Sequence, residues 1–297
     1  MKKSTKILLC LSAIFVALGT VLTVGSLVFE MDPVYAFRSG MLDFTIQQKR
    51  TSEFSSDGRY AIPADGMTEL SVDWLDGTIE VEMYEGSEII LQETSSSVLD
   101  ESNALMYTKK NDTLEITSAP SEYGIAISGI CQGNKDLHIY LPKNIEWKKV
   151  QIDAQNSDIS IGGMTALNLE VDAVDGDLSL SEVELENLSF NSMGGNLMAQ
   201  NSHVEKMNVD TTSGDMNMDL RICPQSIQFD TINGDAQLYL PDDSEFTIQM
   251  DTVSGNLNSD FSGIHKDEYF TVGSGAAQFE MNTDSGSVQV NKTESKK

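Results

Sequence analysis

The stretch that decides the fold is VDAVDGDLSL, residues 171–180, because variants of this ten-residue phrase recur along the chain. Close copies start at residues 190, 209, 229 and 250, so successive starts lie 19, 19, 20 and 21 residues apart. Looser copies start at residues 72, 152 and 281. A fixed period of this size is typical of a stacked repeat architecture, in which each copy supplies one equivalent layer.

Each copy alternates apolar and polar residues on both sides of a small polar centre, which predicts two short strands joined at a corner. We number the ten positions of the phrase 1 to 10. Position 6 is glycine in seven of the eight copies, and we expect a positive φ there because glycine tolerates it. The copy that starts at residue 152 carries Ser157 instead. The corner glycines are Gly77, Gly176, Gly195, Gly214, Gly234, Gly255 and Gly286.

Two folds fit this pattern. Asn-Gly or Asp-Gly between alternating runs is a strong hairpin signal, which keeps a sandwich of antiparallel hairpins as an alternative. A sandwich has no reason to hold apolar, acidic and glycine positions at a constant period, whereas a β-solenoid stacks equivalent residues coil upon coil. We therefore predict an all-β fold, a single-stranded β-solenoid (β-helix) with coils of 19–21 residues and a continuous narrow apolar core.

The predicted solenoid covers residues 64–290, with irregular first coils or a cap at 64–142 and regular coils at 143–290. A juxtamembrane linker at residues 30–63 precedes it, and a short tail at residues 291–297 follows it. Because the apolar residues of such a domain face inward, we do not predict an oligomer.

The N-terminus carries an export signal. Residues 7–29 contain no charged side chain and are long enough to cross a hydrocarbon core of ~30 Å as one helix. Lys2, Lys3 and Lys6 precede this segment, so the positive-inside rule predicts that residues 1–6 are cytoplasmic and the repeats extracellular. We favour a single-pass cell-membrane anchor, and a cleaved signal peptide is the alternative.

The charge balance limits the partners. The chain has 19 Lys and Arg against 46 Asp and Glu, for a formal net charge of −27. Phosphate recognition needs basic surface, so nucleic acid is excluded as a partner of the repeats. Cationic peptides, basic envelope proteins and divalent ions are better candidates, although acidity also serves simply to keep an exposed domain soluble.

Position 2 of the phrase is Asp or Asn in all eight copies, so a solenoid would stack these residues in a row. Hydrogen bonding of each side chain to the backbone of the turn is one interpretation. Calcium held by Asp172, Asp210, Asp230 and Asp251 is the other, since calcium prefers oxygen ligands. The spacing matches neither an EF-hand nor the Gly-Gly-x-Gly-x-Asp calcium repeat. No other cofactor is predicted.

Catalytic patterns are sparse. His138, His203 and His265 are scattered, and the sequence contains no HExxH, paired CxxC or GxSxG motif. Arg221 beside Asp219 is compatible with the remnant of a polysaccharide-cleaving site or, more simply, with a surface ion pair. We therefore predict that the protein is not an enzyme.

The tryptophans and cysteines leave alternatives open. Trp74 and Trp147 are candidates for stacking on a sugar, and packing in the core or cap is the alternative. Cys131 and Cys223 are 92 residues apart, which corresponds to several coils, so we predict no disulfide between them. Cys10 lies within the apolar N-terminal segment, too early for a lipoprotein cysteine.

The apolar-Asp-Thr-x-Ser-Gly-Asp-apolar phrases, the segments IYLP (139–142) and LYLP (238–241), and FTVGSGAAQFEMNTDSGSVQV (270–290) carry a resemblance to a known family. Over residues 64–290 the chain resembles the bacterial putative-adhesin family of unknown function with β-strand repeats. The resemblance implies a membrane-anchored protein of Gram-positive type, some members being encoded beside envelope-stress systems that respond to cell-wall antibiotics and cationic peptides. It implies no catalytic residues.

We therefore expect a membrane-anchored, extracytoplasmic binding or scaffold protein of the bacterial cell envelope, linked to envelope-stress sensing or to resistance against cationic peptides. A surface adhesin that binds a polymer or glycan is the first alternative. A degenerate polysaccharide-active β-helix enzyme is the second.

Overall fold

The computed structural model describes residues 42–43, 52–101, 103–118, 126–127 and 135–293. It divides into two units, Met1–Lys49 with Pro120–Ile130, and Arg50–Ala119 with Cys131–Lys297. In the first unit the described residues are β1 (Leu42–Asp43) and β7 (Ala126–Ile127), which pair antiparallel.

All regular elements among the described residues are strands, and none of those residues belongs to a helix of membrane-spanning length. The predicted cytoplasmic tail, the segment 7–29, Cys10 and Cys131 lie outside the described residues.

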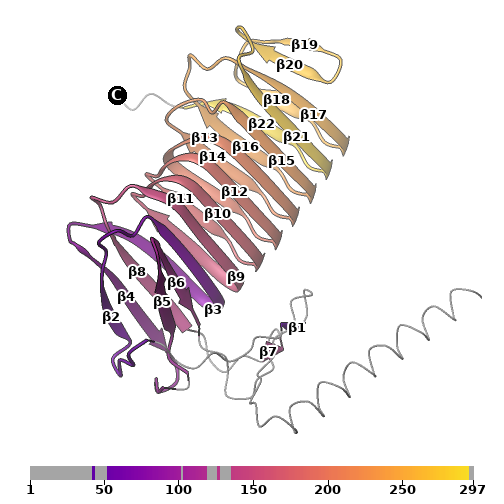
Figure 1. Cartoon of the computed structure of the whole chain (residues 1–297). Coiled ribbons are helices and arrows are strands. Elements are labelled where there is room, and N and C mark those ends of the chain that lie inside the picture. The colour runs from indigo at the N-terminus through magenta and orange to yellow at the C-terminus, as the bar shows by residue number, and fades with distance from the viewer. Residues whose placement is uncertain (1–41, 44–51, 102, 119–125, 128–134, 294–297) are drawn as a thin grey trace, which may run out of the picture. The chain divides into compact units, whose positions relative to one another are not determined.

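The second unit is a stack of coils in which two sheets face each other across the core (Figure 1). Sheet A contains positions 1 to 3 of each phrase and sheet B positions 8 to 10. Sheet A is ordered β5 (Met106–Lys110), β6 (Thr113–Thr117), β3 (Glu69–Tyr84), β9 (Trp147–Gly162), β10 (Thr165–Asp175), β12 (Glu184–Gly194), β13 (Leu197–Ser213), β15 (Ser226–Asn233), β21 (Ala277–Ser285), β17 (Phe246–Ser254), β20 (Tyr269–Val272) and β19 (Ile264–Lys266).

Sheet B includes the second halves of β3 and β9 and the first part of β13, because these long strands pass from one sheet into the other. Its order is β2 (Arg59–Pro63), β4 (Glu88–Ser95), β8 (Lys135–Pro142), β3, β9, β11 (Leu178–Ser181), β13, β14 (Met216–Leu220), β16 (Ala236–Leu240), β22 (Val288–Lys292) and β18 (Leu257–Ser259).

Copies of the phrase pair in parallel and in register. Val171 lies between Ile152 and Phe190, and Phe190 lies between Val171 and Val209. The solenoid prediction is therefore confirmed, and the sandwich of hairpins is wrong, because hairpins would pair equivalent phrases antiparallel.

Inward residues of both sheets form one apolar core. In most copies, positions 1, 8 and 10 bury apolar side chains, from Ala to Phe, in columns that run from coil to coil. Trp74 and Trp147 are fully buried, and the Trp74 indole N–H donates to the Lys135 carbonyl oxygen at 2.8 Å. Of the two interpretations of the tryptophans, core packing is therefore right, and sugar stacking is wrong because neither ring reaches the surface.

The last coils do not follow the order of the sequence. In sheet A, β21 lies between β15 and β17, so the phrase from residue 281 is inserted between those from 229 and 250. The outer edge of β17 pairs antiparallel with β20. A further parallel coil therefore cannot pair with β17 at that edge. Short antiparallel strands, β19 at this end and β5 at the other, finish the sheet and limit edge-to-edge association.

The corner glycines are required mainly by close approach between coils. A Cβ on Gly195 would lie 2.1 Å from the Gly176 carbonyl oxygen, and one on Gly214 would lie 2.0 Å from that of Gly195. Gly77 and Gly176 have φ of 116° and 138°, as expected. The expected positive φ is wrong for Gly195, Gly214, Gly234, Gly255 and Gly286, where the backbone of the neighbouring coil occupies the space of a side chain.

Substitution of Gly195 by Ala should therefore destabilise the protein by about 3 kcal/mol, since the added methyl group forces adjacent coils apart. Its neighbour Gly194 is the control, because a Cβ there would meet Asp175 Oδ1 at an ordinary 3.5 Å. The Gly194→Ala change should alter stability by less than ~1 kcal/mol. Chemical denaturation checks both, and equal losses would mean that the close approach does not limit stability.

A buried ion pair fixes the start of β8. Lys135 Nζ lies 2.9 Å from Glu93 Oε1 and also donates to the Asn103 carbonyl oxygen. Glu93 Oε2 accepts a hydrogen bond of 2.8 Å from the Leu105 N–H, and the Glu93 carboxylate is fully shielded from solvent. A buried pair with its remaining hydrogen bonds satisfied holds strands β4 and β8 together, as their backbones also pair.

The Glu93→Gln change should cost about 3 kcal/mol, because it leaves the Lys135 ammonium in a shielded site without a counter-charge. Glu115, which pairs with Lys110 at 2.8 Å on the surface, is the matched control. Glu115→Gln should cost less than ~1 kcal/mol because solvent screens that pair. Urea titrations of the two variants compare the costs, and a Glu93→Gln variant as stable as the control would contradict the assignment.

Candidate functional site

The outer face of sheet A carries three parallel rows of polar side chains. Every second residue of a strand points away from the core. Because the strands pair in parallel register, these outward residues line up from coil to coil and form rows. The first row comprises Lys149, Asn168, Asn187, Lys206, Ser226 and Gln278. The second row comprises Glu170, Ser189, Asn208, Gln228, Glu280 and Gln249. The acidic row is position 2 of the phrase: Asp73, Asp153, Asp172, Asn191, Asp210, Asp230, Asn282 and Asp251.

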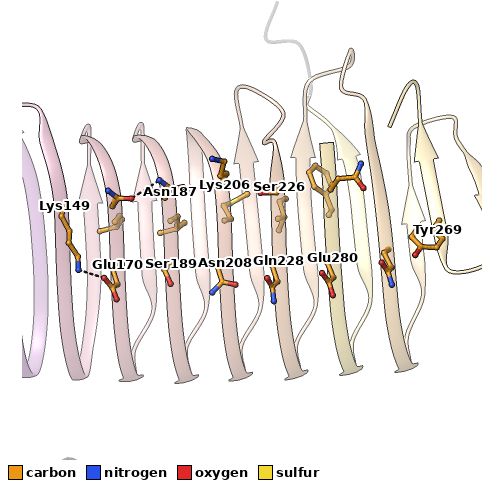
Figure 2. A pocket seen from close by; sticks show the side chains of 18 residues that line it. Lys149, Glu170, Asn187, Ser189, Lys206, Asn208, Ser226, Gln228, Tyr269 and Glu280 are labelled. Atoms are coloured by element: carbon orange, nitrogen blue, oxygen red, sulfur yellow. Dashed lines mark hydrogen bonds and ion pairs between the residues drawn. The ribbon is translucent and has the colours of Figure 1, made fainter. Parts of the chain in front are cut away.

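The first and second rows line a groove of about 800 Å³ that runs along the stack of coils. Figure 2 shows Lys149 and Glu170 at one end, Tyr269 at the other, and Ser189, Asn208 and Gln228 between them. Because the lining comes from eight successive strands of sheet A, β9 to β20, the groove is elongated across the strands.

Three polar side chains in the middle of this groove are unengaged, although their neighbours Asn187 and Gln228 donate to Asn168 and Asp230. At one end Lys149 Nζ pairs with Glu170 Oε2 at 2.8 Å, and at the other Gln278 Nε2 donates to the Gly275 carbonyl oxygen at 2.7 Å. Ser189, Asn208 and Lys206 make no side-chain hydrogen bond or ion pair within the described part of the chain. Their polar groups are therefore available to a ligand.

The groove is close to neutral, unlike the rest of the protein. Its charged side chains are Lys149, Lys206, Glu170 and Glu280, two of each sign. The other polar lining groups are amides, hydroxyls and one phenol, which both donate and accept hydrogen bonds. This arrangement suits binding, and the groove residues include no nucleophile paired with a general base.

The acidic row forms as predicted from the repeat, but its contacts differ from both interpretations of position 2. Asn191 Nδ2 donates to Asp172 Oδ1 at 2.7 Å, and Asn282 Nδ2 donates to Asp230 Oδ1 at 2.7 Å. The amides thus link neighbouring coils side chain to side chain, so capping of the turn backbone is wrong for these residues. The Gln228 amide, 2.7 Å from Asp230 Oδ2, adds a further donor.

The described residues do not support the calcium interpretation of position 2. In the described ranges no three or more His, Cys, Asp or Glu side chains are placed to hold one ion. Asn191 separates Asp172 from Asp210, and Asn282 separates Asp230 from Asp251. Three of these aspartates, Asp210, Asp230 and Asp251, instead border a second, smaller groove of about 450 Å³ near the corner, together with exposed Ile232 and Val253.

Capping of the corner is carried out by position 7, which the sequence analysis did not single out. Asp177 Oδ1 accepts from the backbone N–H of Asn196 at 2.8 Å, and Asn196 Oδ1 accepts from that of Asp215 at 2.9 Å. Asp215 in turn accepts from the Asp235 N–H at 2.8 Å. The sequence signal was available, because position 7 is Asp or Asn in most copies, directly after the glycine.

The remaining candidates do not assemble into a site. Arg221 forms a surface ion pair, as the simpler interpretation predicts, but its partner is Glu184 at 3.0 Å and not Asp219. His138 stacks on Tyr140 and lies 3.3 Å from Glu80, far along the chain from His203 and His265. Burial raises the pKa of the Cys223 thiol, which keeps it protonated and unreactive at neutral pH.

The family model described as Toastrack DUF4097 matches residues 61–291. Three solved structures are each similar over 79% of this chain: a putative cell adhesion protein from Clostridium sporogenes (13% identity, 98% of that chain, TM-score 0.39), a putative adhesin from Bacteroides fragilis (10%, 96%, 0.47) and one from Parabacteroides distasonis (12%, 96%, 0.43). No curated protein matches the chain.

The acidic row makes a prediction about charge. Asn191→Asp should destabilise the protein by about 1–2 kcal/mol at low salt, because it removes a donor and adds a carboxylate between Asp172 and Asp210. The loss of stability should be smaller in 1 M NaCl, where the Debye length falls to ~3 Å and the carboxylates repel each other less.

Asn187→Asp on the same strand is the matched control, since its neighbours in register are Asn168 and Lys206. Thermal unfolding at two salt concentrations compares the variants. If both behave alike, repulsion along the acidic row is not a stability term.

Proposed function

Since the chain belongs to the Toastrack DUF4097 family, we propose that it uses the stacked β-fold for binding rather than catalysis, as an extracytoplasmic protein of the bacterial cell envelope. The observation that carries this proposal is the groove on sheet A, whose unengaged polar side chains come from several consecutive coils. A ligand in this groove contacts equivalent positions again and again, so many weak contacts add up to useful affinity.

The proposed location rests on the N-terminal sequence. Residues 7–29 are uncharged and follow three lysines, which supports a single-pass anchor with the N-terminus in the cytoplasm. The protein then holds its groove at the outer surface of the cell membrane, where it meets envelope polymers. Binding to a polymer or glycan, the adhesin alternative, is the form of this function that the groove favours.

A second candidate is recognition of cationic peptides in envelope-stress sensing or resistance. It is favoured by the acidic row, whose aspartates lie beside exposed Ile232 and Val253 in the second groove. A basic, partly apolar peptide complements such a surface in charge and in hydrophobicity. This second candidate includes two further expectations, that the protein comes from a Gram-positive bacterium and that it acts with a stress-signalling system.

The proposal predicts that the full-length protein in mild detergent sediments with insoluble cell-wall fragments. Ser189→Trp, which fills the centre of the groove, should weaken the affinity about tenfold, equivalent to ~1.4 kcal/mol. Ser179→Trp is the matched control, because Ser179 is a half-buried outward serine of β11 on sheet B. Equal binding by the two variants would contradict the proposed surface.

Replacement of Asp172, Asp210, Asp230 and Asp251 by Asn separates the two candidates. If this variant loses binding to a cationic peptide while Ser189→Trp keeps it, the acidic row is the peptide-binding surface and the second candidate is right. Protease added to intact cells should cleave the repeat domain, and complete protection of that domain would contradict the extracytoplasmic location.

A further inference from the structure

We propose that the groove on sheet A binds one linear, uncharged polysaccharide chain laid along the stack of coils. This inference rests on the proposed binding function and names its ligand class. We choose the groove rather than the acidic row or the corner because Ser189, Asn208 and Lys206 at its centre are unengaged and its charges cancel.

The shape of the groove favours a chain over a compact molecule. Its lining extends from Lys149 on β9 to Tyr269 on β20 and crosses eight adjacent strands of sheet A. At a strand spacing of ~4.8 Å this corresponds to a length of roughly 30 Å. A volume of about 800 Å³ spread over that length is narrow, so it accommodates a single extended chain.

The periodicity of the lining favours a polymer with a repeating unit. Ser189, Asn208 and Gln228 occupy the same register position on successive strands β12, β13 and β15. Side chains that both donate and accept hydrogen bonds therefore recur at the same place in these three coils, although the Gln228 amide also donates to Asp230. A polysaccharide also presents equivalent hydroxyl groups at a regular spacing. A hydrogen bond that is favourable for one sugar unit is therefore repeated for the following units.

The chemistry of the groove selects hydroxyl groups. Amides and serines donate and accept at once, which matches the dual capacity of a sugar hydroxyl. In the middle of the groove, Asn208 and Ser189 have no side-chain partner in the described part of the protein, so a ligand does not have to displace an internal contact. Binding therefore does not cost the free energy of breaking a hydrogen bond within the protein.

The charge of the surroundings excludes a polyanion. The acidic row lies one outward position away from the second row, and the protein carries a net charge of −27. A chain of carboxylates or phosphates would be repelled there. A polycation is also disfavoured in the middle of the groove, because Lys206 has no ion-pair partner among the described residues and repels it. An uncharged chain meets neither penalty.

Tyr269 supplies an aromatic surface at one end. Its side chain is 40% exposed and lines the groove next to Gln249, with which it is paired between β20 and β17. Aromatic rings with one exposed face pack against the apolar face of a sugar ring while the hydroxyl remains free to hydrogen-bond. The hairpin β19–β20 thus places an exposed aromatic ring at this end of the groove, on which a sugar ring can stack.

The test measures binding of the full-length protein in mild detergent to linear glucan and N-acetylglucosamine oligomers of matched length. Hexamers should bind more tightly than trimers, because they reach more coils. A glucosamine hexamer and a carboxymethylated glucan provide cationic and anionic counterparts. Tighter binding of either charged form than of every neutral oligomer would overturn the proposed ligand class.

Variants locate the site. Asn208→Ala and Tyr269→Ala should each weaken binding of a neutral hexamer about five- to tenfold, whereas Tyr269→Phe should retain most of it. Tyr239→Ala on the outer face of sheet B is the matched control and should have no effect. Binding unaffected by Asn208→Ala and by both Tyr269 changes would overturn the proposal.

The two proposals fail in different ways. If no neutral oligomer binds but the protein still sediments with wall fragments in a manner blocked by Ser189→Trp, the ligand class is wrong and the binding function stands. If neither oligomers nor wall fragments bind, the binding function itself is wrong.

Discussion

The constraint on which the structure depends is the close approach of successive coils at the corner between the two sheets. There the carbonyl oxygen of one glycine occupies the place where the next coil would carry a Cβ, as for Gly195 and Gly214. This contact fixes the register of neighbouring coils. Register then aligns the inward residues in columns and the outward residues in rows, so the core and the surface have a common origin.

Stacking in register has a consequence for charge. It brings carboxylates from neighbouring coils within about one strand spacing, where they repel. The chain meets this repulsion in two ways. Asn191 and Asn282 interrupt the acidic row and donate to the aspartate next to them, and the aspartates of position 7 accept backbone N–H groups from the following coil. Acidic residues are thereby part of the fold as well as of the surface.

The same register builds the groove. A single coil presents only two or three polar side chains, too few for recognition, but eight strands together present a surface long enough for a polymer. The proposed binding uses equivalent positions of several coils. It differs from an active site, in which a few groups from distant parts of the chain converge on one reacting atom.

The solenoid, the corner glycines, the core positions and the acidic row could all be predicted from the sequence, because each follows from a period that is visible along the chain. The other features depend on contacts between coils. Tertiary structure placed β21 before β17, since the edge of β17 is taken by β20, and it gave position 7 the capping role expected of position 2. It also selected Ser189, Asn208 and Lys206 as unengaged groups. Which polar side chains find a partner depends on the coils above and below them, and a period in the sequence does not specify those contacts.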